Sequence, residues 1–256
     1  IQNIKNNFHG KYSEWAYQPV LNSLFGLSSG CWKNQDLCFE EGFVGLAVRL
    51  MDEHGGEQKI AEETLQAVKA LLYYSPHEYR KALADAGLAG KLLKVLQENP
   101  ADRGAVSLAC ETMASFVGPK VLVGPATSTG RLIPFSPEVQ ALASEAGAVE
   151  QLLATATSGT HLVHHQHTFN FDVNAAYNAD ADCLDALATL AHNSSANQKA
   201  MAKAGLAQHL SSQLRQGGLN DRVKSGACSI MSLLASSGEP LLGTAGDTFR
   251  SSCKEA

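Results

Sequence analysis

The chain has 256 residues, of which 45% are hydrophobic and 18% are charged, and its formal net charge at pH 7 is -5. This length is sufficient to bury a sizeable core. Lys and Arg never reach a run of three, and the balance is acidic, which disfavours nucleic-acid binding because that function usually needs a basic face. No apolar run reaches the roughly 18 residues that a membrane-spanning helix requires. We therefore predict no membrane span.

Cysteine usage argues against a disulfide scaffold. The six cysteines are Cys31, Cys38, Cys110, Cys183, Cys228 and Cys253. They are spread along the chain and no pair has the Cys-x-x-Cys spacing. We interpret them as small buried thiols, which implies a reducing intracellular compartment, either the cytoplasm or an organelle.

In chain order, an apolar helix near 15–28 is followed by four segments that each read as helix, glycine turn, helix. The turn glycines are Gly42, Gly87, Gly147 and Gly205. Gly is the usual residue where a chain turns left-handed after a helix. The downstream residues keep register, because Cys110 follows Gly87 by 23 positions and Cys228 follows Gly205 by the same 23. This spacing predicts an internal repeat.

A second alignment and the helix starts support the repeat independently. Residues 21–42 match residues 184–205 without a gap, and the pair Asn34-Gln35 falls on Asn197-Gln198. Ser-Pro pairs at 75–76 and 136–137 are typical helix starts, with Ser as the N-cap and Pro as the first helical residue. Both pairs precede their glycine by 11 or 12 residues.

With these features in place, the chain resembles the armadillo family. Residues 186–191, Ala-Leu-Ala-Thr-Leu-Ala, match the core of that family's long third helix, and Ala146-Gly147-Ala148 matches its turn. The spacing of 45 residues between Gly42 and Gly87 is near the roughly 40–47 expected for such repeats. The resemblance covers about residues 20–237. It implies an all-α, right-handed α-solenoid of armadillo-like three-helix repeats.

The repeat also predicts the domain organisation. A single repeat cannot bury its apolar face, so neighbours must stack into one continuous core. We expect one solenoid over 1–238, with about four repeats and a leading helix, and a loosely ordered tail over 239–256. Two stretches, near 118–135 and 158–180, break the period and are predicted to be loop insertions.

Motifs for catalysis are missing from the sequence, so we predict a protein that is not an enzyme and needs no cofactor. There is no Gly-x-Ser-x-Gly elbow and no phosphate-binding loop. The alternative is a metal-binding or catalytic helical protein, because imidazole groups ligate transition metals. The histidines concerned are His161, His164, His165 and His167. Their spacing matches no closed metal site, so we favour a polar insertion.

The resemblance places partner binding in a concave groove lined by the third helices. Armadillo members that carry nuclear-import peptides have Trp and, four residues on, Asn in each third helix. None of the five third helices here keeps that pair, which argues against such a carrier. The groove residues expected instead are Asn22, Gln66, Glu111, Ser115, Asp185, Thr189 and Ser229.

These groove residues suit a helix or a folded protein surface, and Glu111 and Asp185 favour a basic segment. The alternative is an interface at an edge or a loop. The function expected from the sequence is therefore a non-catalytic scaffold for protein–protein interaction, or a structural subunit of a larger intracellular assembly. The partner would bind through the groove and the inserted loops.

Overall fold

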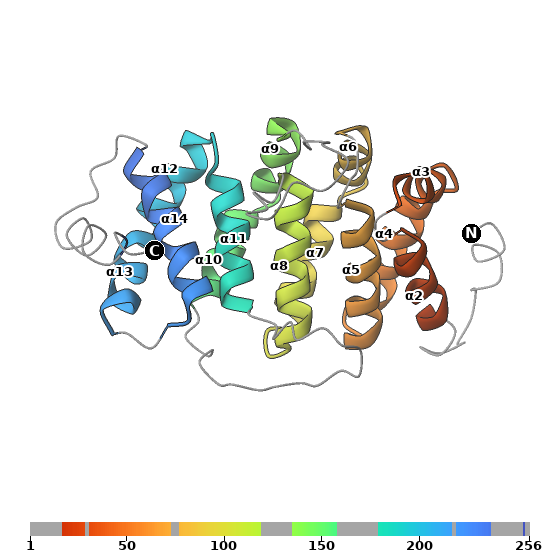
Figure 1. Ribbon diagram of the computed structural model, residues 1–256, viewed down its shortest axis with the longest axis horizontal. Coiled ribbons are helices and arrows are strands. Elements are labelled where there is room, and N and C mark those ends of the chain that lie inside the picture. Colours follow the sequence, from red (N-terminus) through yellow and green to blue (C-terminus); the bar gives the residue numbers. More distant parts are fainter. Residues whose placement is uncertain are drawn as a thin grey trace. The chain divides into compact units, whose positions relative to one another are not determined.

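The computed structural model describes residues 17–28, 31–72, 77–118, 135–157, 179–216, 219–236 and Cys253. Within these ranges the secondary structure consists of thirteen helices and turns, with no strand (Figure 1). The chain divides into two compact units, an N-terminal unit over 1–148 and a C-terminal unit over 149–256. Each unit is described by itself below.

The helices follow the predicted repeat order. A leading helix, α2 (Tyr17–Ser28), precedes four groups of three helices. The groups are α3 (Trp32–Glu40), α4 (Phe43–His54) and α5 (Gln58–Leu72); α6 (His77–Asp85), α7 (Leu88–Glu98) and α8 (Arg103–Val117); α9 (Pro137–Glu145), α10 (Ala148–Thr157) and α11 (Ala179–Ala191); and α12 (Ser195–Lys203), α13 (Leu206–Gln216) and α14 (Asp221–Ser236). The described helices thus occur in the order of one leading helix and four glycine-centred groups of three.

Each turn glycine separates the first helix of its repeat from the second. Gly42, Gly87, Gly147 and Gly205 have φ angles of 80°, 81°, 88° and 79°. This left-handed conformation brings Cβ of an L-residue too close to the following carbonyl oxygen, whereas Gly adopts it freely. The four glycines identified from spacing therefore share one backbone conformation, as predicted.

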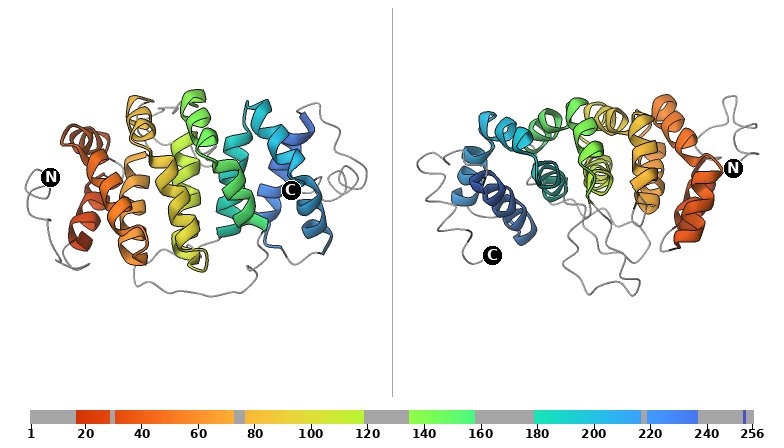
Figure 2. Two further views of the ribbon diagram at one scale, coloured as in Figure 1. Left: turned by 180° about the vertical axis from the view of Figure 1, so that it is seen from behind. Right: turned by 90° about the horizontal axis from the view of Figure 1, so that it is seen from above.

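In the N-terminal unit the long third helices α2, α5 and α8 lie side by side, each in contact with the next (Figure 1). The second helices α4 and α7 form another row, seen from behind in Figure 2, and pack on α5 and α8 respectively. Apolar side chains fill the space between the rows, and Phe43, Leu65 and Phe116 are fully buried there. Burial of the facing apolar stripes is what holds the unit together.

Paired amides tie two of the first helices, α3 and α12, to the end of the third helix that precedes each of them. Asn34 Nδ2 donates to the Leu27 carbonyl at 2.7 Å and Gln35 Nε2 donates to the Ser28 carbonyl at 3.0 Å. In the C-terminal unit Asn197 Nδ2 and Gln198 Nε2 donate to the Leu190 and Ala191 carbonyls, at 2.7 and 2.8 Å. These carbonyls lie in the last turn of a helix and have no partner within it. We call this arrangement the Asn-Gln clasp.

Helix starts agree with the sequence where the structure describes them. Ser136 is the N-cap of α9, with its hydroxyl accepting from the Val139 N–H at 3.3 Å and Pro137 as the first helical residue. The equivalent pair at 75–76 lies outside the described residues. The same is true of 119–134, of 158–178 and of 239–252, so the predicted loops and most of the predicted tail stay predictions.

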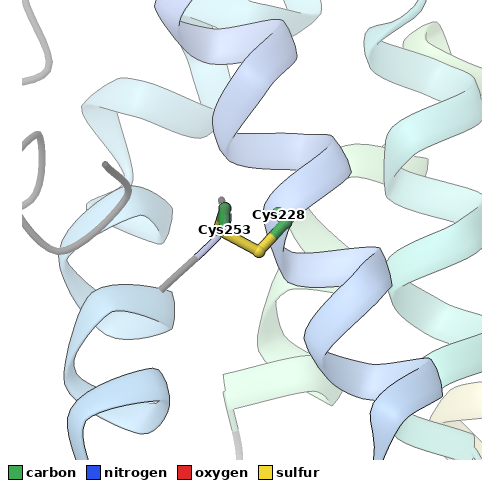
Figure 3. Close-up of a disulfide and its surroundings, with 2 residues drawn as sticks. All are labelled: Cys228 and Cys253. Atoms are coloured by element: carbon green, nitrogen blue, oxygen red, sulfur yellow. A yellow bond between two sulfur atoms is a disulfide. The ribbon is translucent and has the colours of Figure 1, made fainter. Parts of the chain in front are cut away.

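In the C-terminal unit, α14 packs on α11, α12 and α13. A disulfide joins Cys228, on α14, to Cys253 (Figure 3). The interpretation of these two cysteines as buried thiols is therefore wrong. It is also wrong for Cys110 and Cys183, which are disulfide-bonded as well, so these four cysteines no longer support a reducing compartment. The disulfide brings Cys253 next to α14. Cys228 and Cys253 are 25 residues apart in the sequence, and this spacing does not predict that they are in contact.

Candidate functional site

Four of the expected groove residues lie on neighbouring third helices of the N-terminal unit. Asn22 is exposed on α2, Gln66 is half-buried on α5, and Glu111 and Ser115 are half-buried on α8. We call the surface that carries these residues the third-helix face. In the C-terminal unit Asp185 and Thr189 are half-buried on α11, and Ser229 is exposed on α14. Each unit thus presents its own set of small or polar side chains, at two registers that are one helical turn apart.

Glu111 on the third-helix face forms an ion pair with a neighbouring helix. Its Oε2 lies 2.5 Å from Nζ of Lys69 on α5, and both side chains are partly shielded from water. Partial burial strengthens the attraction relative to bulk water. The carboxylate is therefore neutralised within the chain, and a basic partner segment would have to compete with Lys69 for it.

Asp185 on α11 is engaged in a similar way. Arg222 on α14 donates Nη2 hydrogen bonds to Asp182 and to Asp185, the latter at 3.2 Å. Burial lowers the pKa of Arg222, but the carboxylates of Asp182 and Asp185 outweigh it and hold that pKa above its usual value. Thr189 is also engaged, because its hydroxyl donates to the Asp185 carbonyl at 2.8 Å.

Sequence reasoning missed the basic members of these two ion pairs. Lys69 precedes Glu111 by 42 residues, and Arg222 follows Asp182 by 40. Both separations are close to one repeat, so opposite charges about one period apart are a signal that could have identified them. Because Lys69 neutralises Glu111, the third-helix face carries less negative charge than the sequence indicated.

Buried Arg80 on α6 occupies the register that Gln35 and Gln198 hold in their clasps, seven residues before the turn glycine. Its side chain is 1% exposed, and Nε and Nη1 have no hydrogen-bond partner in the part of the chain that the structure describes. Burial lowers the pKa of Arg80 to about 10. Because the guanidinium is enclosed, it offers no open site for a ligand, and it acts on stability instead.

On the other side of α6, Tyr79 links the first helices of two repeats. Its ring stacks on that of Phe39 with centroids 3.8 Å apart, and its hydroxyl donates to Asp36 Oδ1 at 2.9 Å. Burial and the bond to Asp36 raise the pKa of Tyr79 to about 12. These contacts are structural.

The alternative metal site cannot be placed, because His161, His164, His165 and His167 lie outside the described residues. Among the residues that are described, no group of three or more His, Cys, Asp or Glu side chains is arranged to hold a metal ion. No helix in the described part of the chain is long and apolar enough to cross a membrane.

Comparison with known proteins supports the fold. No protein-family model matches the chain, and no curated protein matches it. The designed armadillo repeat protein YIII(Dq)4CqI is 14% identical with a TM-score of 0.66, over 94% of this chain and 93% of that one. The designed armadillo repeat protein YIII(Dq.V1)4CPAF in complex with peptide (KR)4 is 15% identical with a TM-score of 0.64, over 95% and 94%.

A crystal structure of an engineered protein is similar to the same extent, with 17% identity and a TM-score of 0.64 over 94% of this chain and 90% of that one. At such identities the likeness is one of fold. The chain is an all-α solenoid of armadillo-like three-helix repeats, which confirms the fold class predicted from the turn glycines and the repeat period.

Proposed function

We propose that this chain is a non-catalytic binding scaffold that recognises another protein through the third-helix face of its N-terminal unit. The observation that carries the proposal is the placement of Asn22, Gln66 and Glu111 at one register on three adjacent helices, with Ser115 one turn further along α8. The fold supports it, because helical-repeat solenoids present extended surfaces for partners and one structural neighbour is a complex with the peptide (KR)4.

The chemistry of the face narrows the kind of partner. It has no Trp at the register of Asn22, Gln66 and Glu111, so it lacks the aromatic shelves that would hold an extended peptide. Because Lys69 neutralises Glu111, recognition rests on small polar groups and shape more than on net charge. A helix or a folded protein surface fits such a face better than an extended basic peptide does.

Affinity purification from the native source tests the proposal with a pair of matched variants. Gln66→Arg with Ser115→Arg places two long cations on the third-helix face. Ala82→Arg places one on the exposed side of α6 and is the control. We expect one defined set of proteins with the wild type and the control, reduced at least about tenfold in the face variant, since one to two lost contacts cost about 1.4 kcal/mol or more.

A charge-exchange variant tests whether the positions of the two charges affect partner binding while the ion pair itself is kept. Lys69→Glu with Glu111→Lys keeps an ion pair between α5 and α8 while reversing its direction. We expect partner recovery to change by less than about threefold, because partly exposed pairs contribute little to binding. Recovery of the same proteins by the wild type and the face variant alike, or no specific recovery by the wild type, would overturn the proposal.

A further inference from the structure

The turn between α11 and α12 carries an asparagine with an uncommon backbone conformation. Asn193 has a φ of 53°, and among the residues that the structure describes it is the one residue other than glycine with a positive φ. Asn is one of the few L-residues that occupy this left-handed region. Asn193 is exposed, whereas Asn197, four residues on, is buried with its amide bonded to the Leu190 carbonyl. The amide of Asn193 therefore lies at the surface of the C-terminal unit.

The residues that follow Asn193 complete a modification motif. Asn-Ser-Ser over 193–195 fits the acceptor pattern for N-linked glycosylation, which is Asn, any residue except Pro, and then Ser or Thr. No other asparagine in the sequence begins this pattern. Because so short a pattern also occurs by chance, its place in the fold has to support it. Ser195, which supplies the required hydroxyl, is exposed as the first residue of α12.

The fold explains the middle residue of the motif better than it explains the other two. Ser194 is the N-cap of α12, and its hydroxyl accepts from the Asn197 N–H at 3.3 Å. Glycine would meet the demand for a positive φ at residue 193, as it does in the four repeat turns. Ser195 follows the cap, where the helix start does not depend on its hydroxyl. The combination of Asn193 with Ser195 is therefore what the acceptor pattern adds.

The cysteines supply a second observation, of unrelated chemistry. Four of the six, Cys110, Cys183, Cys228 and Cys253, are disulfide-bonded. Disulfides form and persist in oxidising environments such as the lumen of the endoplasmic reticulum, and they are rare in the cytosol. N-linked glycans are attached in that same lumen. The bonded cysteines and the glycosylation motif thus indicate one and the same compartment.

We propose that Asn193 is a site of N-linked glycosylation and that the chain matures in an oxidising compartment of the secretory pathway. Asn193 Nδ2 forms a bond to C1 of the first sugar of a lipid-pyrophosphate-linked oligosaccharide. The bond from C1 to the phosphate oxygen breaks, the lipid pyrophosphate leaves, and the amide nitrogen loses one proton, so the transfer needs no oxidant or reductant. A glycan on this turn would point into solvent, because Asn193 and Ser195 are both exposed.

Mass spectrometry of the full chain purified from its native source tests the proposal. We expect the peptide that contains Asn193 to carry a glycan, which peptide N-glycosidase removes to leave Asp at residue 193. An unmodified Asn193 in that protein would overturn the proposal. A thiol-blocking reagent applied before reduction should leave the four bonded cysteines unlabelled. Labelling of these cysteines would overturn the assignment to an oxidising compartment.

Matched serine variants separate the modification from the helix cap. Ser195→Ala removes the acceptor hydroxyl but keeps the N-cap, so the glycan should be lost while the enzymatically deglycosylated protein melts as the wild type does. Ser194→Ala keeps the acceptor pattern but removes the cap bond, so the glycan should stay while the deglycosylated protein melts at a lower temperature. A glycan that persists in Ser195→Ala, or that disappears in Ser194→Ala, would contradict the assignment.

Asn193→Gly is the variant least exposed to a loss of folding. Gly adopts a positive φ freely, so this variant should fold and lack the glycan. A glycan still present on the peptide around residue 193 would overturn the assignment to Asn193. All of these readouts concern the turn after α11 and not the third-helix face, so failure of the proposed function would leave them unchanged.

Discussion

The N-terminal and C-terminal units use the same amide clasp but different charges between their third helices. The donor pair is Asn34 and Gln35 in the first unit and Asn197 and Gln198 in the second. The ion pairs between third helices differ, because Lys69 meets a half-buried Glu111 whereas Arg222 meets Asp182, which is 1% exposed. Both units therefore use the same side-chain amides to hydrogen-bond the carbonyls at a helix end, whereas the ion pairs differ between the units.

The outer helices of the two units differ as well. Helix α2 has no charged residue, and Leu27 is exposed on it. Helix α14 carries Arg222 and Lys224, and its exposed positions include Ser229 and Ser232. Helix α14 therefore exposes charged groups, whereas α2 has none to expose.

The ion pairs give the largest contrast between the units. Arg222→Met leaves the buried Asp182 carboxylate without its arginine, so we expect the free energy of unfolding to fall by about 3 kcal/mol. This is the low end for a buried pair, because Arg222 is itself 44% exposed. Lys69→Met should cost less than about 1 kcal/mol, since both partners are only partly buried. Urea denaturation measures both, and equal losses would contradict the contrast.

Arg80 stands at the position of the clasp glutamine, and its replacement is expected to raise stability where replacement of the glutamine lowers it. Arg80→Met removes a buried cation that has no counter-charge among the described residues, so we expect the free energy of unfolding to rise, by about 2 kcal/mol. The folded-state pKa of about 10 lies below the ordinary 12.5, so the folded protein bears the full penalty below pH 10. The penalty declines as pH rises from 10 towards 12.5.

The difference between Arg80→Met and the wild type should therefore shrink above pH 10. Chemical denaturation followed by circular dichroism at pH 7 and pH 11 measures that difference. A gain that is the same at both pH values would show that the charge of Arg80 is not its source. As a contrast, Gln198→Met should lower stability, because it removes the side-chain hydrogen bond to the Ala191 carbonyl and leaves that carbonyl only the Ser194 N–H.

The turn glycines test whether the two units share one backbone requirement. Gly87→Val and Gly205→Val should each lower the free energy of unfolding by more than about 1 kcal/mol, because a β-branched residue tolerates a positive φ poorly. Steric contact does not contribute, since a Cβ would meet nothing within 4 Å at Gly87 and one side-chain oxygen at 3.8 Å at Gly205. Melting temperature measures both.

The control for the glycines is Gly90→Ala. Gly90 lies inside α7 and a Cβ there has open space, so this change should raise stability by about 0.5–1 kcal/mol. A loss from Gly90→Ala as large as that from Gly87→Val would mean that the positive φ is not the reason.

The last comparison concerns the asparagines of the clasp. Asn34→Ala and Asn197→Ala each remove one side-chain donor to a helix-end carbonyl, so each should lower the free energy of unfolding by about 1 kcal/mol. The loss at Asn197 should be the larger one, because Asn197 is buried and Asn34 is not. The reverse order, measured by thermal melting, would argue against the clasp as a common device.

The sequence by itself determined the repeat. Gly42, Gly87, Gly147 and Gly205 were identifiable because a left-handed turn restricts the residue type strongly. The match of Asn34-Gln35 to Asn197-Gln198 was identifiable as well, and local geometry explains it, since each amide reaches a carbonyl only seven residues away. Local requirements of this kind restrict the residue type at fixed positions of the repeat, so they can be recognised in the sequence.

Only the tertiary structure decided how the charged and sulfur groups pair. Glu111 and Asp185 read as free acids of a binding face, but Lys69 and Arg222 reach them from neighbouring helices. Cys228 read as a buried thiol, but it is bonded to Cys253. These contacts join residues on different helices, and pairing across such distances depends on how the helices pack, which repeat spacing and residue type do not specify.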